Sequence, residues 1–300
     1  MKYKFQRQDA IPELETHAQG HCIHIGKISP GCRGCFTAEP HSGVQIGNNC
    51  MKNCNYCYYD RKIVDTERYE HRIKDIISDF FRNSLNDNWK PICFSYQSSG
   101  ETLLYLDHFE QIARILNHVS MRSGIRHYYF LYTNGLLVNK EVLHRLKEFP
   151  VYELRFHLGA TNFSEEVFKN MELAGKYGFT LTVETPSYPP HREQILGMLP
   201  RIEDLGVTHV DLVETQITAH NKEKIAKEYP EAVIYKDYFY HLFDKGLVYD
   251  VMEERIARNH TYSVLDCNSG VERCRHGKHQ HVGFEMNSIE GMCADWNYNL

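Results

Sequence analysis

Three cysteines that lie close together carry the strongest chemical signal in the chain. Cys50, Cys54 and Cys57 fall within eight residues, directly after a short apolar stretch that we predict to be a strand. A loop of this length can bring three thiolates to one side of a metal site. A cube-shaped iron–sulfur cluster of four irons takes four cysteine ligands, so three leave one iron open. The spacing therefore predicts a 4Fe–4S cluster that binds a further molecule at its fourth iron.

A zinc ribbon is the main alternative use of these thiols. Cys32 and Cys35 form one C-x2-C pair, Cys54 and Cys57 form a second, and 18 residues separate the pairs. This spacing matches a structural zinc site with four thiolates. It leaves Cys50 without a role, and it would make the chain a zinc-ribbon interaction protein rather than an enzyme.

A Ser-Gly-Glu segment follows the next predicted strand. Ser99, Gly100 and Glu101 come directly after apolar residues 92–96 and a short polar link. Glycine lets the backbone approach a ligand closely, and a carboxylate accepts hydrogen bonds from an ammonium group. The segment is informative because it lies one strand–helix unit after the three cysteines.

The two motifs together resemble those of the radical S-adenosylmethionine (SAM) enzymes. These enzymes combine a CxxxCxxC loop, with an aromatic residue such as Tyr56 between the last two cysteines, and a Gly-Gly-Glu-Pro motif after the second strand. The resemblance implies a 4Fe–4S cluster on the three cysteines and SAM on its open iron. It places Ser99, Gly100 and Glu101 at the SAM site, with Glu101 holding the SAM ammonium group.

Polar residues also follow the ends of later predicted strands. Within the resemblance, His157 faces the SAM ribose, and Asn134 and Glu184 are further candidate cofactor-binding residues. Each has an alternative. Asn134 fits an ordinary turn, His157 fits a strand-end histidine bonded to a backbone carbonyl, and Glu184, like Glu214, fits a substrate ligand or a solvated strand end.

The upstream cysteine pair predicts a second metal site. Cys32 and Cys35 follow a glycine, as in a branch of radical SAM proteins related to pyruvate formate-lyase activating enzymes, a branch with no activity to transfer. Two thiolates do not complete a site, so Cys267 and Cys274 are the expected partners, and Cys22 competes with Cys274. The four thiolates could hold an auxiliary 4Fe–4S cluster or a structural zinc ion.

Two remaining cysteines have different expected roles. Cys93 lies inside an apolar strand and is expected to behave as a small core residue. Cys293 lies near the end of a tail that could cover the active site. If the enzyme is an epimerase, Cys293 is our candidate catalytic residue, the thiol that gives a hydrogen atom to a carbon radical. The alternative is a buried tail cysteine.

The middle of the sequence alternates between apolar strands and amphipathic helices. This pattern predicts an α/β fold with a parallel sheet, a partial (β/α)6 barrel similar to the TIM barrel, with its chemistry at the carboxyl ends of the strands. We expect an N-terminal Cys-rich lobe at 1–43, the barrel at 44–230, and a C-terminal extension at 231–300 that completes the auxiliary site and covers the active site. Both ends read as irregular and share a composition rich in Cys, His and Gly, so we expect them to meet. The predicted strands are 44–46, 92–96, 127–132, 152–157, 180–184 and 209–213, and the predicted helices lie near 65–86, 107–122, 139–148, 164–176, 191–205 and 218–228.

Composition restricts the possible partners. The formal net charge of −5 argues against a nucleic-acid binder. No apolar run approaches the roughly 18–20 residues of a membrane helix, and the first residues lack the apolar core of a signal peptide. We therefore expect a cytoplasmic protein without membrane association.

The expected activity is reductive cleavage of SAM to a 5′-deoxyadenosyl radical, which removes a hydrogen atom from substrate. The substrate would be a sugar-containing natural product or a peptide, with epimerisation as one outcome. A flavodoxin- or ferredoxin-type protein would supply the electron. An activase that installs a glycyl radical on a partner enzyme is the alternative, although such activases often lack an auxiliary cluster.

Overall fold

The fold is described by a computed structural model of the 300-residue chain. Within it the structure describes residues 11, 13–17, 22–36, 41–59, 78, 93–124, 126–231, 234–236, 240–242 and 246–267. Most of the helix predicted near 65–86 lies outside these residues, as do Cys274 and Cys293.

A nine-stranded sheet forms the centre of the described part of the chain, in the order β1-β2-β12-β8-β7-β6-β5-β4-β3. Neighbours from β3 to β8 pair in parallel, and β12 continues the parallel sheet beside β8. Parallel neighbours need crossover connections, which the helices between them provide. The six predicted strands are confirmed, and the observed bounds of the parallel strands are β3 His41–Gln45, β4 Cys93–Gln97, β5 Tyr128–Thr133, β6 Val151–Phe156, β7 Thr180–Pro186, β8 His209–Val213 and β12 Ser263–Cys267.

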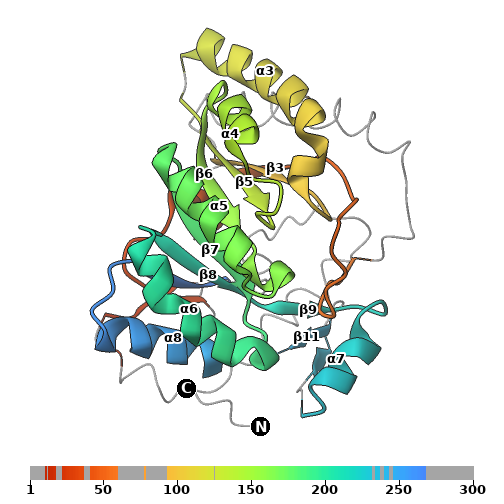
Figure 1. Ribbon diagram of the computed structural model, residues 1–300, viewed down its shortest axis with the longest axis vertical. Coiled ribbons are helices and arrows are strands. Elements are labelled where there is room, and N and C mark those ends of the chain that lie inside the picture. The colour runs from red at the N-terminus through yellow and green to blue at the C-terminus, as the bar shows by residue number, and fades with distance from the viewer. Residues whose placement is uncertain are drawn as a thin grey trace.

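Helices cover the outer face of this sheet (Figure 1). In α5, Val167, Phe168, Met171 and Ala174 are buried, a spacing that places them along one side of a helix. The helix ends just before Gly178, whose φ of 75° is a conformation that glycine adopts without strain. The observed helices are α3 Leu106–Ser123, α4 Lys140–Lys147, α5 Glu165–Lys176, α6 Arg192–Asp204, α7 Lys222–Glu228 and α8 Gly246–Ala257, with short 3-10 turns at Thr102–Tyr105, Leu158–Thr161 and Pro189–His191.

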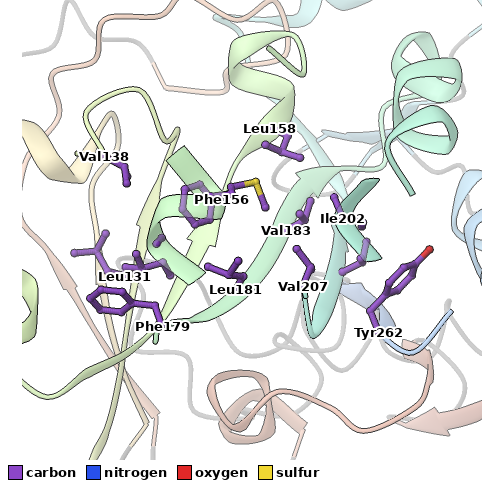
Figure 2. Close-up of a cluster of buried hydrophobic side chains, with 14 of the residues drawn as sticks. Leu131, Val138, Phe156, Leu158, Phe179, Leu181, Val183, Ile202, Val207 and Tyr262 are labelled. Atoms are coloured by element: carbon purple, nitrogen blue, oxygen red, sulfur yellow. The ribbon is translucent and has the colours of Figure 1, made fainter. Parts of the chain in front are cut away.

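The main core lies between the strands and these helices (Figure 2). Phe156 of β6 and Leu181 and Val183 of β7 are at most 2% exposed, and they belong to the same buried cluster as Ile202 of α6. Fully burying a side chain of this size contributes roughly 1.5–3 kcal/mol. Because these strand residues point toward the helices, their neighbours in sequence point to the concave side of the sheet.

The two chain ends meet at one edge of the sheet, as predicted. The hairpin of β1 (Glu15–His17) and β2 (Cys22–Ile25) joins antiparallel to β12, with Ile25 opposite Val264. The ends are not irregular, however. The first part of the chain also contains helix α1 (Pro30–Phe36), and α8 and β12 continue the alternation beyond residue 235.

These elements have weak sequence patterns for physical reasons. β1 and β2 have only three and four residues, too few for a clear period. In α8, Leu247, Val248, Tyr249, Val251 and Met252 are all buried, so the helix lacks a polar face along that stretch.

Helix α1 carries the chain from β2, which lies beside the edge strand β1, toward β3 at the other edge of the sheet. On the way, residues 29–32 occupy the concave side. A Cβ atom on Gly31 would lie 2.5 Å from Arg155 Nη2 and 3.0 Å from the Phe130 ring, so no larger residue fits between these side chains. We call residues 29–32 the plug, because they fill the interior of the partial barrel.

A second, smaller sheet follows β8. It consists of β9 (Thr215–Ile217), β10 (Ile234–Lys236) and β11 (Tyr240–Leu242), all antiparallel, with α7 between β9 and β10. In the described part of the chain, no helix is both long and apolar enough to cross a membrane.

Candidate active site at the carboxyl ends of the strands

The loop with the three cysteines is hydrogen-bonded along its start to the Ser-Gly-Glu segment. Ile46 N donates to Gln97 O at 2.8 Å, Ser99 N to Gly47 O at 2.9 Å, and Glu101 N to Asn49 O at 2.8 Å. These bonds continue the parallel pairing of β3 and β4 beyond the strand ends. The two motifs, separated in sequence by some fifty residues, are therefore neighbours in space.

Two glycines make this close approach possible. A Cβ atom on Gly100 would lie 2.0 Å from Asn49 O, and one on Gly47 would lie 2.1 Å from the Tyr105 ring. The Tyr105 hydroxyl in turn accepts hydrogen bonds from Asn48 N at 3.1 Å and Asn49 N at 2.7 Å. The start of the cysteine loop is thus held by backbone and side-chain bonds together.

All three cysteines line one open pocket with a volume of about 280 Å³. Cys50 Sγ accepts from Lys52 N at 3.4 Å, and the Asn134 side-chain amide lies 3.9 Å from the same sulfur. N–H groups that point at sulfur suit a cluster ligand, because they stabilise its negative charge. The three thiols, these donors and the open pocket that they share fit a 4Fe–4S cluster with SAM.

No three Cys, His, Asp or Glu side chains of the described residues converge as ligands of a single metal ion would. The three sulfurs instead share the wall of the pocket. Ser98 lines the same pocket, and so do Ser99 and Gly100, which the sequence analysis placed at the SAM site.

Glu101 lies beneath the pocket wall rather than on it. It is fully buried, and its carboxylate accepts hydrogen bonds from Leu103 N at 3.0 Å, Thr133 Oγ1 at 2.7 Å and Asn134 N at 2.6 Å. These bonds join the end of β5 to the segment after β4. In this arrangement Glu101 supports the site, and a contact with the SAM ammonium group would need the side chain to leave its partners.

His157 and Tyr56 form a pair in the wall of the pocket. The Tyr56 hydroxyl and His157 Nε2 are 3.1 Å apart, and both residues line the pocket. Burial, together with His191 nearby, lowers the pKa of His157 to about 4, so its imidazole is neutral at physiological pH. Tyr188 and His191 pack against the Tyr56 ring with centroids 5.4 and 5.5 Å away, a cluster that the sequence analysis did not foresee.

The segment after β8 holds the cysteine loop from a third side. Asn221 is fully buried, and its side-chain amide donates to Tyr56 O at 3.0 Å and to Gln216 O at 2.8 Å. Thr218 Oγ1 donates to Tyr58 O at 2.9 Å. These contacts could not be predicted from the sequence, because Asn and Thr are ordinary residues at a helix start.

Arg155 and three carboxylates lie at the base of the pocket, on the concave side of the sheet. Its guanidinium contacts Glu153 at 2.7 Å, Glu184 at 3.0 Å and Asp211 at 3.2 Å. Of these residues only Glu184, a candidate cofactor-binding residue from the sequence, lines the pocket. The others were missed, although charged residues inside the apolar strands 151–156 and 209–213 were a visible signal.

The surroundings raise the pKa values of two of these carboxyl groups and lower that of the third. Burial raises the pKa of Glu184 to about 7 and that of Asp211 to about 6, against the opposing effect of Arg155. Burial alone would also raise the pKa of Glu153, but Arg155 and the Thr182 hydroxyl outweigh it and the pKa is lowered. Glu153 is therefore the ionised partner of Arg155.

Cys32 of the plug lies within this buried network. It is 4% exposed, its thiol donates to Asp211 Oδ2 at 3.1 Å, and its sulfur accepts from Arg155 Nη2 at 3.2 Å. Burial raises the pKa of Cys32 well above its usual range. Burial, followed by Glu184, also raises the pKa of Tyr132, with smaller contributions from Cys32 and Cys267. The side chain of Cys35, together with Cys274 and Cys293, lies outside the described residues.

Cys93 is confirmed as a core residue. It is 9% exposed and its thiol donates to Pro30 O at 2.9 Å, which joins β4 to the start of α1.

Comparisons with known proteins agree with this geometry. Residues 44–185 match the family model of the Radical SAM superfamily. Those residues contain the three cysteines, the Ser-Gly-Glu segment and strands β4 to β6, so the match covers both sequence motifs and the part of the sheet that positions them. No curated protein matches the chain.

Solved structures show the same fold at low sequence identity. Streptococcus suis SuiB bound to the precursor peptide SuiA superposes with a TM-score of 0.54 and 12% identity, over 86% of this chain and 56% of that one. SuiB bound to S-adenosylmethionine superposes with a TM-score of 0.51 and 10% identity, over 85% of this chain and 54% of that one. For anSMEcpe with bound AdoMet the TM-score is 0.49 and the identity 15%, over 75% of this chain and 63% of that one. The chain thus spans little more than half the length of SuiB.

Proposed function

We propose that this protein is a radical SAM enzyme that acts on a peptide or a sugar-containing natural product. The observation that carries the proposal is the hydrogen-bonded pairing of the cysteine loop with the Ser-Gly-Glu segment around one pocket. When bound, a 4Fe–4S cluster and SAM would supply a 5′-deoxyadenosyl radical that removes a hydrogen atom from substrate.

The residues of the chain would hold and shield this chemistry. Cys50, Cys54 and Cys57 would bind the cluster, and the backbone of Ser99 and Gly100 would contact SAM. Neutral His157 and the Tyr56 hydroxyl offer a hydrogen-bonding pair for the ribose without adding positive charge beside the SAM sulfonium. Tyr56 in the pocket wall, backed by Tyr188 and His191, would exclude water from the radical.

A peptide substrate is supported by one neighbour. SuiB is described with a precursor peptide, and a peptide substrate for this chain is an analogy at the level of the fold. The glycyl radical activase is the second candidate, but no specific observation favours it. An epimerase with Cys293 as hydrogen donor, and a flavodoxin or ferredoxin as electron source, stay predictions.

The auxiliary cluster also stays a proposal. Its support is the pairing of β2 with β12, which brings the N-terminal segment beside the strand that ends at Cys267, and the influence of both Cys32 and Cys267 on one phenol, that of Tyr132. A cluster there would need the Cys32 thiol to lose its proton to a site that already holds Asp211.

Iron content and SAM cleavage test the proposal directly. After anaerobic reconstitution we expect about eight irons per chain if both clusters form, and about four if only the first does. Replacing Cys50, Cys54 and Cys57 together by alanine should abolish SAM cleavage. Cys32→Ala with Cys267→Ala is the matched control, because it removes thiols outside the first cluster and should leave four irons. If the protein holds zinc and no iron when it is handled without oxygen, the proposal that it is a radical SAM enzyme is refuted.

A further inference from the structure

The base of the pocket carries more negative than positive charge. Arg155 contacts Glu153, Glu184 and Asp211, so three carboxylates share one guanidinium. Its other donors are also engaged, since Nη2 donates to Ser29 Oγ at 2.9 Å and to Cys32 Sγ at 3.2 Å. When all three carboxyl groups are ionised, two negative charges are left without a cation. Because the group is buried, water screens this excess poorly, and a further cation would stabilise it.

Glu184 is the member of the group that reaches the pocket. Its side chain is 16% exposed and lines the pocket, whereas Glu153, Arg155 and Asp211 lie behind it. Glu184 Oε2 accepts from Arg155 Nη1 at 3.0 Å, and its second oxygen, Oε1, meets no donor of the described chain. One carboxylate oxygen is therefore left for a ligand.

Thr215 provides a second acceptor on the pocket wall. It is 2% exposed, and its hydroxyl has no hydrogen-bond partner among the described residues. A buried hydroxyl without a partner costs free energy, which a ligand donor would recover. Among the described residues that line the pocket, none is a lysine or an arginine, so the wall offers no cation of its own.

We propose that Glu184 and Thr215 bind a primary ammonium group of the substrate, so that the enzyme acts on amine-bearing molecules. This inference rests on the proposed function and adds the substrate class to it. An ammonium group suits the site better than a guanidinium. A guanidinium pairs best with both oxygens of a carboxylate, but one oxygen of Glu184 is already held by Arg155. An ammonium group needs only single acceptors in several directions.

The test compares charged and neutral probes on the anaerobic, cluster-loaded enzyme with SAM present. The probes are Nα-acetyl-lysine methylamide, its uncharged counterpart Nα-acetyl-norleucine methylamide, and putrescine, a small diamine that separates a free amine from a peptide side chain. We expect at least tenfold tighter binding of the lysine probe or putrescine than of the norleucine probe. Glu184→Gln should abolish this preference and leave iron content and SAM affinity unchanged. Thr215→Val should weaken it. Glu193→Gln, at an exposed position on α6, is the matched control and should keep it.

Two results would overturn the inference. One is equal binding of charged and neutral probes to the wild-type enzyme. The other is a Glu184→Gln variant that binds SAM at least tenfold more weakly and keeps the preference for the charged probes, which would make Glu184 a cofactor ligand instead. Failure of the proposed function looks different, because the wild-type protein would then bind no iron and cleave no SAM.

Discussion

At the scale of single residues, burial separates groups that face the pocket from groups that support it. Glu101 and Glu184 both follow the sequence pattern of a strand-end carboxylate. In the structure the first is fully buried on three donors of the chain, whereas the second lines the pocket and accepts from Arg155 through one oxygen. The same residue type thus serves two purposes, which only the surrounding contacts distinguish.

We expect Glu101→Gln to loosen the site as well as weaken SAM binding. Glutamine has one acceptor oxygen, so at least one donor, such as Asn134 N, would lose its partner. A buried donor left unpaired costs about 1–3 kcal/mol. The thermal midpoint and the iron content should therefore fall together. The control Glu166→Gln, at an exposed position in the first turn of α5, should cost less than about 1 kcal/mol.

A different result would support the role of Glu101 that we expected from the sequence, which is to hold the SAM ammonium group. If Glu101→Gln keeps wild-type stability and iron content but binds SAM at least tenfold more weakly in an anaerobic titration, the carboxylate contacts the SAM ammonium group directly.

At the scale of elements, the site depends on the contact between the starts of two loops. Residues 46–49 and 97–101 run side by side because Gly100 has no side chain to separate them. We expect Gly100→Ala to push the loops apart, since its Cβ would meet Asn49 O at 2.0 Å. Iron incorporation and SAM binding should both drop by at least tenfold.

Gly197 offers a matched control for this substitution. It lies within α6, and a Cβ atom there would meet nothing within 4 Å. Gly197→Ala should therefore leave the cluster intact and stabilise the helix by up to about 1 kcal/mol. A Gly100→Ala variant with full iron content and normal SAM binding would show that the loops do not need this close contact.

Elements and motifs with a strong local pattern were predictable, and contacts between distant segments were not. The parallel strands from β4 to β8 begin and end within two residues of their predicted bounds, and Cys50 to Cys57 form one compact sequence motif. The group around Arg155 draws on α1 and three different strands. Charged residues inside apolar strands are a signal in each segment, but only the fold shows which of them meet.

At the scale of the whole molecule, the interior of the barrel is ionic and should respond to acid. His209, at the start of β8, is bonded to Ser263 through Nδ1 at 2.7 Å. Burial, with Arg155 and Lys27 adding to it against Glu153, lowers the pKa of His209 from 6.5 to about 4. Between these values the unfolded chain binds a proton that the folded chain does not, so stability falls as pH falls.

Comparison with His209→Gln isolates this effect. The variant loses the titrating group at every pH, and any change in its bond to Ser263 is the same throughout. From pH 7.5 to 5, wild type should lose about 2 kcal/mol of unfolding free energy relative to the variant. Anaerobic thermal midpoints at both pH values measure this. A difference between the two proteins that stays constant with pH would contradict the prediction.

The plug and the edge hairpin also set the order in which the molecule can be completed. During synthesis the plug leaves the ribosome early, yet its partner Asp211 lies 179 residues later, and β2 pairs with a strand that includes Val264. The first segment must therefore wait, without its native contacts, until nearly the whole described chain has been made. Such long-range contacts slow folding and prolong exposure of unpaired strand edges. Joining the plug and β2 to the strands that are made later closes the interior on which the pocket rests.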